Sequence, residues 1–510
     1  MWLRTVRHAL LAAVLALASA CEEQGAAPQL QLITTTCSGA SPLQGVTHLR
    51  LRVTGEGLSA PIERVTPVNL RPEDVPAVPP GARRMFEVRG YTGEPSSSGR
   101  VVSVGRSGPF EMPAQGAPAD PVRVILRRVD TFVPVESSQL PGSCLELEDA
   151  RAGHTATLLP DGRVMLAGGV RVAGAGGFET LNSVEFLDPM ARTLTYVPQV
   201  GADGARRAFH TASLTLDGRV ALVGGEVQSG TGATPLRSVV VINPTTQDTQ
   251  QFELAEARTR HVAAVDISGR VLLVGGTGQG GTPLATPEGV EPAASKSFAV
   301  PTPMPRVGAS VRALPDGQRL VVAGGSDGTR LVREVRTLAF NGTTFAPTGA
   351  TLQLRQGRQS PALAPYDTAG KLLVLGGYNT AGVPDPSSRP IALTEILDFT
   401  GETPGLSVGP STVARAAICA EALGDGRVLA MGGQSPGEGG LVSSGVVELI
   451  TPTPNVTGGV LGMEQVAPRH LHTCTLLPDG AVLVTGGVDT TGGAARMASG
   501  PLVFMPVPRD

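Results

Sequence analysis

A Gly-Gly pair that closes a short apolar run recurs seven times along this chain, and it restricts the available folds more than any other feature. The first glycines of successive pairs lie 49 to 56 residues apart. A turn glycine precedes each pair by six or seven residues, and five of the seven turns are Asp-Gly, a strong hairpin signal. Each unit is therefore predicted to open with a β-hairpin. The pairs begin at Gly168, Gly224, Gly275, Gly324, Gly376, Gly432 and Gly486.

Two weaker strands are predicted to follow each hairpin. Four antiparallel strands per repeat indicate a β-propeller blade, because one such sheet cannot bury both faces and a closed ring of them can. The seventh unit has room for a third strand but no fourth, so we expect residues 144–151, which are similar to 251–258, to supply it. The third strands are expected at 184–188, 239–242, 394–398 and 446–450, and the fourth strands at Tyr196, Phe252, Phe298 and Phe345.

The repeat carries a family resemblance. The pattern Arg-x-x-His-x-Ala-x-Leu-x-x-Asp-Gly-Arg-Val-x-x-x-Gly-Gly, at residues 151–169 and 207–225, resembles bacterial kelch repeats and the propeller of galactose-oxidase-like proteins. Kelch blades usually carry a tryptophan on the fourth strand, whereas the one tryptophan here is Trp2. The chain is thus predicted to be all-β, with a seven-bladed kelch-type propeller over residues 143–510.

The region before the propeller lacks the repeat. Apolar and polar residues alternate at 48–53, 86–89 and 122–127, with Pro- and Gly-rich turns between them. This period of two is typical of strands that bury one face. Residues 31–134 are predicted to form a small β-sandwich of immunoglobulin-like or transthyretin-like type.

The N-terminus has the pattern of an export signal. Arg4 and Arg7 precede a short apolar run, and residues 17–21 (Leu-Ala-Ser-Ala-Cys) resemble the lipobox of bacterial lipoproteins. That resemblance implies a signal peptide at 1–20, lipidation of Cys21, a tether at 21–30 and an outer-membrane location with the face left open. An ordinary secretory peptide is the alternative.

Four further cysteines suit an oxidising compartment. Proximity along the repeats favours pairing Cys419 with Cys474, and Cys37 with Cys144. Cys419 and Cys474 fall on the inner strands of adjacent blades with an offset of one residue, which in an ideal sheet points their side chains to opposite faces. Buried, unpaired thiols are the alternative.

An arginine recurs once per blade before the inner strand, which predicts a ring around the channel mouth. The ring suits either an anion or sugar-acid site or structural pairing with backbone carbonyls and with glutamates such as Glu185, Glu395 and Glu448 between blades. We favour the structural interpretation, because a binding site rarely keeps full symmetry. The arginines are Arg151, Arg207, Arg258, Arg306, Arg358, Arg415 and Arg469.

Four of the blades carry a histidine three residues after the repeat arginine. Histidines near one channel mouth suit a metal, but blades 7, 1, 2 and 3 span half the ring, too far apart for coordination bonds of about 2 Å. We therefore predict no metal and a structural role. The histidines are His154, His210, His261 and His472.

No catalytic motif stands out. The nucleophile elbow, the Walker loop, His-Glu-x-x-His and sialidase boxes are absent. Copper radical oxidases, which the galactose-oxidase-like resemblance suggests, need two tyrosines, two histidines and a cysteine linked to tyrosine, and this set cannot be assigned here. We therefore predict a protein that is not an enzyme and has no cofactor. The tyrosines are Tyr91, Tyr196, Tyr366 and Tyr378.

The predicted function is binding. A net charge of −3 provides no basic face for nucleic acid. We expect a monomeric, lipid-anchored envelope protein whose propeller binds an envelope protein or a polysaccharide. The alternatives are a carbohydrate-active or oxidative enzyme with a galactose-oxidase-like propeller, and a purely structural envelope component.

Overall fold

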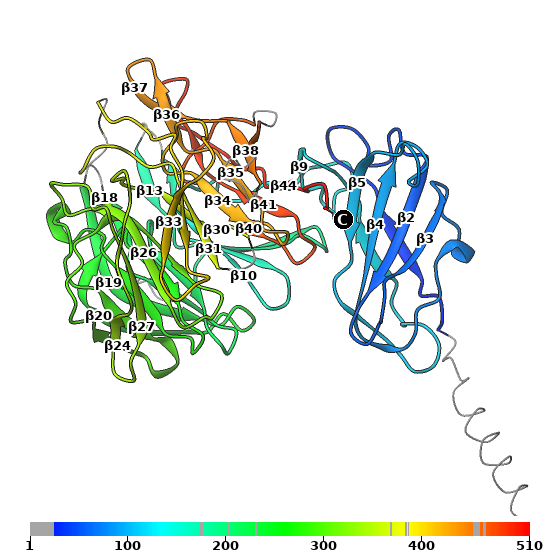
Figure 1. Cartoon of the computed structure of the whole chain (residues 1–510), viewed down its shortest axis with the longest axis horizontal. Helices are drawn as coiled ribbons and strands as arrows, with labels where there is room; N and C mark the ends of the chain where they lie inside the picture. The colour runs from blue at the N-terminus through cyan, green and yellow to red at the C-terminus, as the bar shows by residue number, and fades with distance from the viewer. Residues whose placement is uncertain are drawn as a thin grey trace, which may run out of the picture. The chain divides into compact units, whose positions relative to one another are not determined.

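The computed structural model describes residues 25–509 except 174–176, 202–204, 230–231, 368–369, 383–384, 386, 452–459 and 463–465. The chain divides into two compact units, one ending at Val129 and including Met505–Val507, the other comprising Asp130–Phe504 and the last residues (Figure 1). The predicted signal peptide and Cys21 lie outside the described residues. No helix in the described ranges is long and apolar enough to cross a membrane.

The N-terminal unit is a β-sandwich. A six-stranded antiparallel sheet runs β3-β2-β4-β5-β8, with β6 paired to β4, and β1 and β7 form a parallel pair. Leu49, Leu51 and Val53 on β2 are fully buried and meet Val122 and Val124 of β7 in one core. The strands are β1 (Leu30–Ile33), β2 (His48–Thr54), β3 (Ile62–Pro67), β4 (Gly81–Tyr91), β5 (Val101–Arg106), β6 (Phe110–Met112), β7 (Val122–Ile125) and β8 (Arg127–Arg128), with a 3-10 turn, η1 (Pro72–Asp74).

Seven antiparallel sheets form the propeller, as the Gly-Gly repeat predicts. Every blade begins with the predicted hairpin, and its second strand is buried along its whole length except at Lys371 in blade 5. The first four blades are β10 (Thr155–Leu158), β11 (Val164–Ala167), β14 (Val184–Asp188) and β15 (Thr193–Val197); β16 (Thr211–Leu214), β17 (Val220–Val223), β19 (Gly232–Ile242) and β20 (Thr249–Arg258); β21 (Val262–Val265), β22 (Val271–Val274), β23 (Glu288–Glu291) and β24 (Lys296–Ala299); and β25 (Val307–Ala313), β26 (Leu320–Ser326), β27 (Glu334–Phe340) and β28 (Phe345–Pro347), with β29 (Leu352–Gln353).

The last three blades follow the same order, and blades 5 and 6 take all four strands from consecutive segments. Blade 3 also carries the short 3-10 turns η4 (Gln279–Gly281) and η5 (Pro292–Ala294). Blades 5, 6 and 7 are β30 (Ala362–Pro365), β31 (Lys371–Leu375), β32 (Glu395–Asp398) and β33 (Gly405–Val408); β34 (Cys419–Ala422), β35 (Val428–Met431), β38 (Val447–Ile450) and β39 (Val460–Gly462); and β40 (Thr473–Leu476), β41 (Val482–Thr485), β44 (Leu502–Phe504) and β9 (Phe132–Pro134).

The strand that closes the ring comes from the N-terminal side, but not from residues 144–151 as the sequence suggested. β9 pairs with β44, and the ring of Phe132 packs 5.0 Å from that of Phe504. The aromatic pair across the two strands fixes β9 there, whereas Leu145 and Leu147 make only single backbone bonds nearby. The propeller therefore begins near Asp130, upstream of the predicted boundary at 143, and takes the end of the segment assigned to the sandwich.

The Gly-Gly pair is required by the close approach of neighbouring blades. Gly168 and Gly169 both have positive φ angles, of 59° and 99°. A Cβ on Gly168 would lie 2.2 Å from the carbonyl oxygen of Arg207 in the next blade. Any larger residue would separate the blades at this point.

Candidate functional site

The seven repeat arginines are buried and hold the first glycine of each pair. Each guanidinium Nη1 donates to the carbonyl oxygen of that glycine in its own blade, at 2.7 to 3.4 Å. All seven side chains are at most 5% exposed, so none of them is available to a ligand. The arginines are Arg151, Arg207, Arg258, Arg306, Arg358, Arg415 and Arg469.

Most of these arginines also bind a glutamate of the same blade. Arg151 and Glu185 approach to 2.6 Å, as do Arg258 with Glu288 and Arg358 with Glu395, and Arg415 binds Glu448. The pairs lie within a blade rather than between blades, because the arginine precedes the first strand and the glutamate lies on the third strand of the same sheet.

The other three arginines depart from this pattern, and Arg469 donates to the carbonyl oxygens of Ala467 and Gly486. Arg207 donates instead to the Ser238 hydroxyl at 2.9 Å, and Arg306 lies 3.8 Å from the partly exposed Glu334. Burial lowers the pKa of Arg207 to about 9 and that of Arg306 to about 10. Both guanidiniums therefore remain charged at neutral pH.

The link between blades runs through the arginine backbone. The N–H of the second glycine in every pair donates to the carbonyl oxygen of the next blade's arginine, at 2.8 to 3.1 Å, and Gly487 closes the ring onto Arg151. Each arginine thus holds its own blade by the side chain and the preceding blade by the main chain. We call these seven linkages the blade latches.

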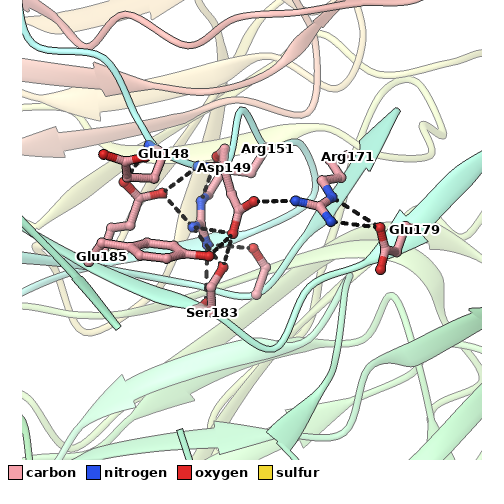
Figure 2. A network of polar contacts seen from close by, with 9 residues as sticks. Glu148, Asp149, Arg151, Arg171, Glu179, Ser183 and Glu185 are labelled. Carbon is pink, nitrogen blue, oxygen red and sulfur yellow. Dashed lines mark hydrogen bonds and ion pairs between the residues drawn. The ribbon is translucent and has the colours of Figure 1, made fainter. Parts of the chain in front are cut away.

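Figure 2 shows Arg151 of blade 1 with Glu185 and the polar network around them. The buried Asp149 accepts hydrogen bonds from Ser183, Tyr196 and Arg171. Burial alone would raise the pKa of Asp149, but these hydrogen bonds and the charges of Arg151 and Arg171 lower it overall. The carboxylate of Asp149 is therefore bonded by protein groups, and the Tyr196 hydroxyl is already used in a hydrogen bond to it.

Three of the four repeat histidines bond to a threonine of the preceding blade. Nε2 of His154, His210 and His261 lies 3.1, 3.0 and 2.9 Å from the hydroxyls of Thr485, Thr155 and Thr211. Burial lowers the pKa of all three, to about 3 for His261. They are neutral bridges between blades, spread around the ring.

The fourth histidine, His472, lacks such a bridge. Neither of its ring nitrogens has a hydrogen-bond partner among the described residues, and burial lowers its pKa to about 3. In the blades that precede the other three histidines this position is Thr473, Thr155 or Thr211, whereas Cys419 occupies it in the blade before His472.

The structure joins Cys419 and Cys474 in a disulfide, with Cα atoms 6.0 Å apart. Blades stack face to face, so the faces that meet are opposite faces of the two sheets. The one-residue offset, which counted against pairing within a flat sheet, is what brings the two sulfurs together. Cys37 and Cys144 are each disulfide-bonded as well, and their pairing with one another stays a prediction.

A belt of backbone surrounds the channel mouth two residues after each repeat arginine. All seven of these residues have φ angles of 50° to 62°, although only two are glycine. Five of the seven successive pairs are joined by an N–H to carbonyl bond, such as Phe209 to Gly153 and Arg260 to Phe209. The sequence gives little sign of the belt, because left-handed backbone is rarely predicted for leucine or phenylalanine. The belt residues are Gly153, Phe209, Arg260, Gly308, Ser360, Ala417 and Leu471.

Two-stranded ribbons rise beside the belt on four consecutive blades. They follow the Gly-Gly pairs of blades 6, 7, 1 and 2, and a backbone bridge next to the belt anchors each one. Blades 3, 4 and 5 have no such ribbon in their described residues. The ribbons are β36 (Gln434–Gly437) with β37 (Gly440–Ser443), β42 (Val488–Asp489) with β43 (Arg496–Met497), β12 (Val170–Val172) with β13 (Phe178–Thr180), and β18 (Glu226–Ser229) with the start of β19.

Neighbouring ribbons touch, so they form a continuous half-ring that we call the wall. The Thr490 N–H donates to Ser443 Oγ at 3.0 Å, and the Gln228 N–H donates to Thr180 Oγ1 at 2.8 Å. Between blades 7 and 1, β43 contacts β12 through an apolar cluster that also contains Leu471 and Phe209 of the belt. The β36–β37 ribbon can be followed beyond its blade in Figure 1.

One cation stands where the wall meets the belt. The guanidinium of Arg260 lies 3.8 Å from the centre of the Phe209 ring and 3.2 Å from Glu226, and its side chain is 50% exposed. Stacking and the ion pair fix its orientation. Arg260 is therefore a preorganised hydrogen-bond donor at the channel mouth. The sequence did not predict its role, because Arg260 is not part of the repeat.

Comparison with known proteins now gives the architecture a context. No protein family and no curated protein sequence matches the chain. Among solved structures, a fungal alcohol oxidase of the AA5 family, in complex with copper, has 16% identity and a TM-score of 0.54 over 71% of this chain and 75% of its own. The structure of YjhT has 16% identity and a TM-score of 0.45 over 62% of this chain and 99% of its own. The fold is a kelch or galactose-oxidase-like propeller.

The oxidase corrects one prediction. We predicted from missing motifs that this chain is not an enzyme, and a neighbour that shares its propeller fold is an oxidase. Missing motifs on this fold therefore do not argue against catalysis. At 16% identity the likeness shows the fold alone.

The copper donor set named for the resemblance does not fit the described residues. The hydroxyls of Tyr196 and Tyr366 donate to Asp149 and to the Thr451 carbonyl, both at 3.0 Å, and that of Tyr378 donates to Gln434. Cys419 and Cys474 bond to each other rather than to a tyrosine. We derive no copper radical chemistry for this chain.

Proposed function

We propose that this protein is an exported, lipid-anchored envelope protein whose propeller binds a polysaccharide or protein ligand at the walled mouth. The observation that carries the proposal is the wall, which breaks the sevenfold symmetry on one face. The blade latches repeat in every blade and are enough to hold the ring. The ribbons take no part in those latches. Their position beside the channel mouth therefore favours a role in binding a ligand.

The chemistry of the mouth supports a polar ligand. The ribbons are rich in Gly, Ser and Thr, which offer adaptable hydrogen bonds at low cost in shape. Arg260 adds a fixed guanidinium fork that suits a carboxylate of an acidic sugar or an acidic side chain. The mouth therefore favours a hydrophilic chain with some negative charge.

Export and anchoring rest on separate support. All four described cysteines are disulfide-bonded, as is usual in oxidising compartments and rare in the cytosol. Together with the signal pattern and Cys21, this favours a periplasmic or surface location for the propeller. Metabolic labelling with a fatty acid tests the anchor, and C21S is expected to abolish the label.

The binding test compares a mouth variant with a variant outside the mouth. The purified protein is screened against acidic and neutral polysaccharides, peptidoglycan fragments and envelope extracts. For any ligand found, Arg260→Ala is expected to weaken binding about tenfold, the loss of one charged hydrogen-bond pair, while Arg219→Ala, in a hairpin turn beside Asp217, leaves it unchanged. Equal effects of both variants would refute binding at the mouth, and turnover of a sugar or alcohol would replace binding with catalysis.

A further inference from the structure

The inner strands of blades 6 and 7 bring together the one group of possible metal ligands found among the described residues. Sγ of Cys419, Sγ of Cys474 and a ring nitrogen of His472 all lie within 4.8 Å of one another. Cys419 comes from β34, and the other two come from β40 and the residue before it. The three residues thus span the interface between two blades.

The unsatisfied state of His472 points to a ligand at this place. Its side chain is 9% exposed, and neither ring nitrogen makes a hydrogen bond of good geometry within the part of the chain that the structure describes. A buried polar group left without a partner destabilises the folded state. The other three repeat histidines avoid that cost through a threonine hydroxyl, whereas His472 faces Cys419 in place of the threonine.

Replacement of the hydroxyl by a thiol changes the chemistry of the position. A neutral imidazole and two thiolates are soft donors that select thiophilic ions. Both cysteines are only partly buried.

We propose that Cys419, His472 and Cys474 form a redox-controlled site for Cu(I). In the oxidised state the disulfide blocks the site. A dithiol reductant transfers two electrons and two protons to the disulfide and leaves as its own disulfide, and the two thiols release their protons as Cu(I) binds. Zn²⁺ in structural sites takes four protein ligands, so a set of three soft donors favours Cu(I).

The test titrates the protein with Cu(I) in both redox states. The purified protein is reduced with a dithiol under nitrogen, desalted, and titrated with Cu(I) against a chromophoric Cu(I) chelator. We expect one Cu(I) per reduced chain and none retained by the oxidised chain. C419S and H472Q are expected to weaken retention at least tenfold, while H210Q, which alters a histidine bonded to Thr155, leaves it unchanged.

Two further measurements keep the result decisive if a variant fails to fold. Bound Cu(I) should protect Cys419 and Cys474 of the wild-type protein from alkylation, read by mass spectrometry, but leave Cys37 and Cys144 reactive after reduction. Equal Cu(I) retention by reduced wild-type protein and by C419S/C474S would overturn the site. Retention of Zn²⁺ with no retention of Cu(I) would overturn the choice of metal.

Discussion

The blade latch of blade 5 lends itself to a quantitative test by Glu395→Gln. Both side chains of the Arg358–Glu395 pair are fully buried, and Glu395 also accepts the Arg355 N–H. The substitution keeps the shape but leaves the guanidinium without a counter-charge. Breaking a buried ion pair by removing one partner costs about 3 to 5 kcal/mol, and the retained amide oxygen moderates this, so we expect about 3 kcal/mol.

Other blades supply matched controls. Glu334→Gln in blade 4 should cost less than about 1 kcal/mol, because Glu334 is 28% exposed and 3.8 Å from Arg306. Ser238→Ala in blade 2 removes a neutral partner of Arg207 and should cost about 1 kcal/mol. We expect the loss of stability to be largest for Glu395→Gln, intermediate for Ser238→Ala and smallest for Glu334→Gln.

The assay is equilibrium unfolding in urea followed by circular dichroism, with the propeller transition fitted separately because the chain has two units. Substantially unchanged slopes would assign the differences to stability rather than to the unfolded state. Equal losses in E395Q and E334Q would refute the reasoning, since they would show that the buried charge pair contributes no more than a surface pair.

Two further predictions concern the ring. The free energy of unfolding should fall as the pH drops from about 7 towards 3. The histidines of the unfolded chain take up protons near pH 6.5, whereas burial holds the pKa of His261 and His472 at about 3 in the folded state. Scanning calorimetry across this pH range measures the stability, and a flat profile above pH 5 would contradict the prediction. Gly487→Ala should destabilise the propeller by more than about 2 kcal/mol, because its φ is 99° and a Cβ there would lie 2.8 Å from the Cβ of His472. Gly493→Ala should cost only about 1 kcal/mol for its left-handed backbone, because a Cβ there meets nothing within 4 Å. Similar shifts in melting temperature for the two variants would count against the close-contact argument.

The propeller was predictable because its repeat is chemical as well as periodic. Asp-Gly turns fix the hairpins, and the Gly-Gly pair marks a close approach between blades that leaves no room for a Cβ atom. The closing strand was assigned to the wrong residues because Phe132 and Phe504 are far apart in the sequence and come into contact only in the folded structure. Residues 144–151 resemble a fourth strand through their acidic and apolar pattern, which serves equally well as an extended connection.

The site was less predictable, for physical reasons that differ by residue. The structural interpretation of the arginines followed from symmetry, but their glutamate partners within the same blade depend on strand order. The one-residue offset of Cys419 and Cys474 counted against a disulfide within one flat sheet. In stacked blades, opposite faces of the two sheets meet, so the same offset favours the disulfide. Arg260 and the belt carry no repeat signature, since left-handed backbone at Leu471 or Phe209 is imposed by the ring rather than by local preference.

The position of β9 sets the timing of folding. Phe132 is made early and its partner Phe504 is made last, and at about 5 to 20 residues per second the interval between them is of the order of 20 to 70 s. Throughout that time β9 lacks its partner strand β44, and blade 1 lacks blade 7 as its neighbour. A chain that ends before β44 has no partner strand for β9, so the ring cannot close until β44 has been synthesised.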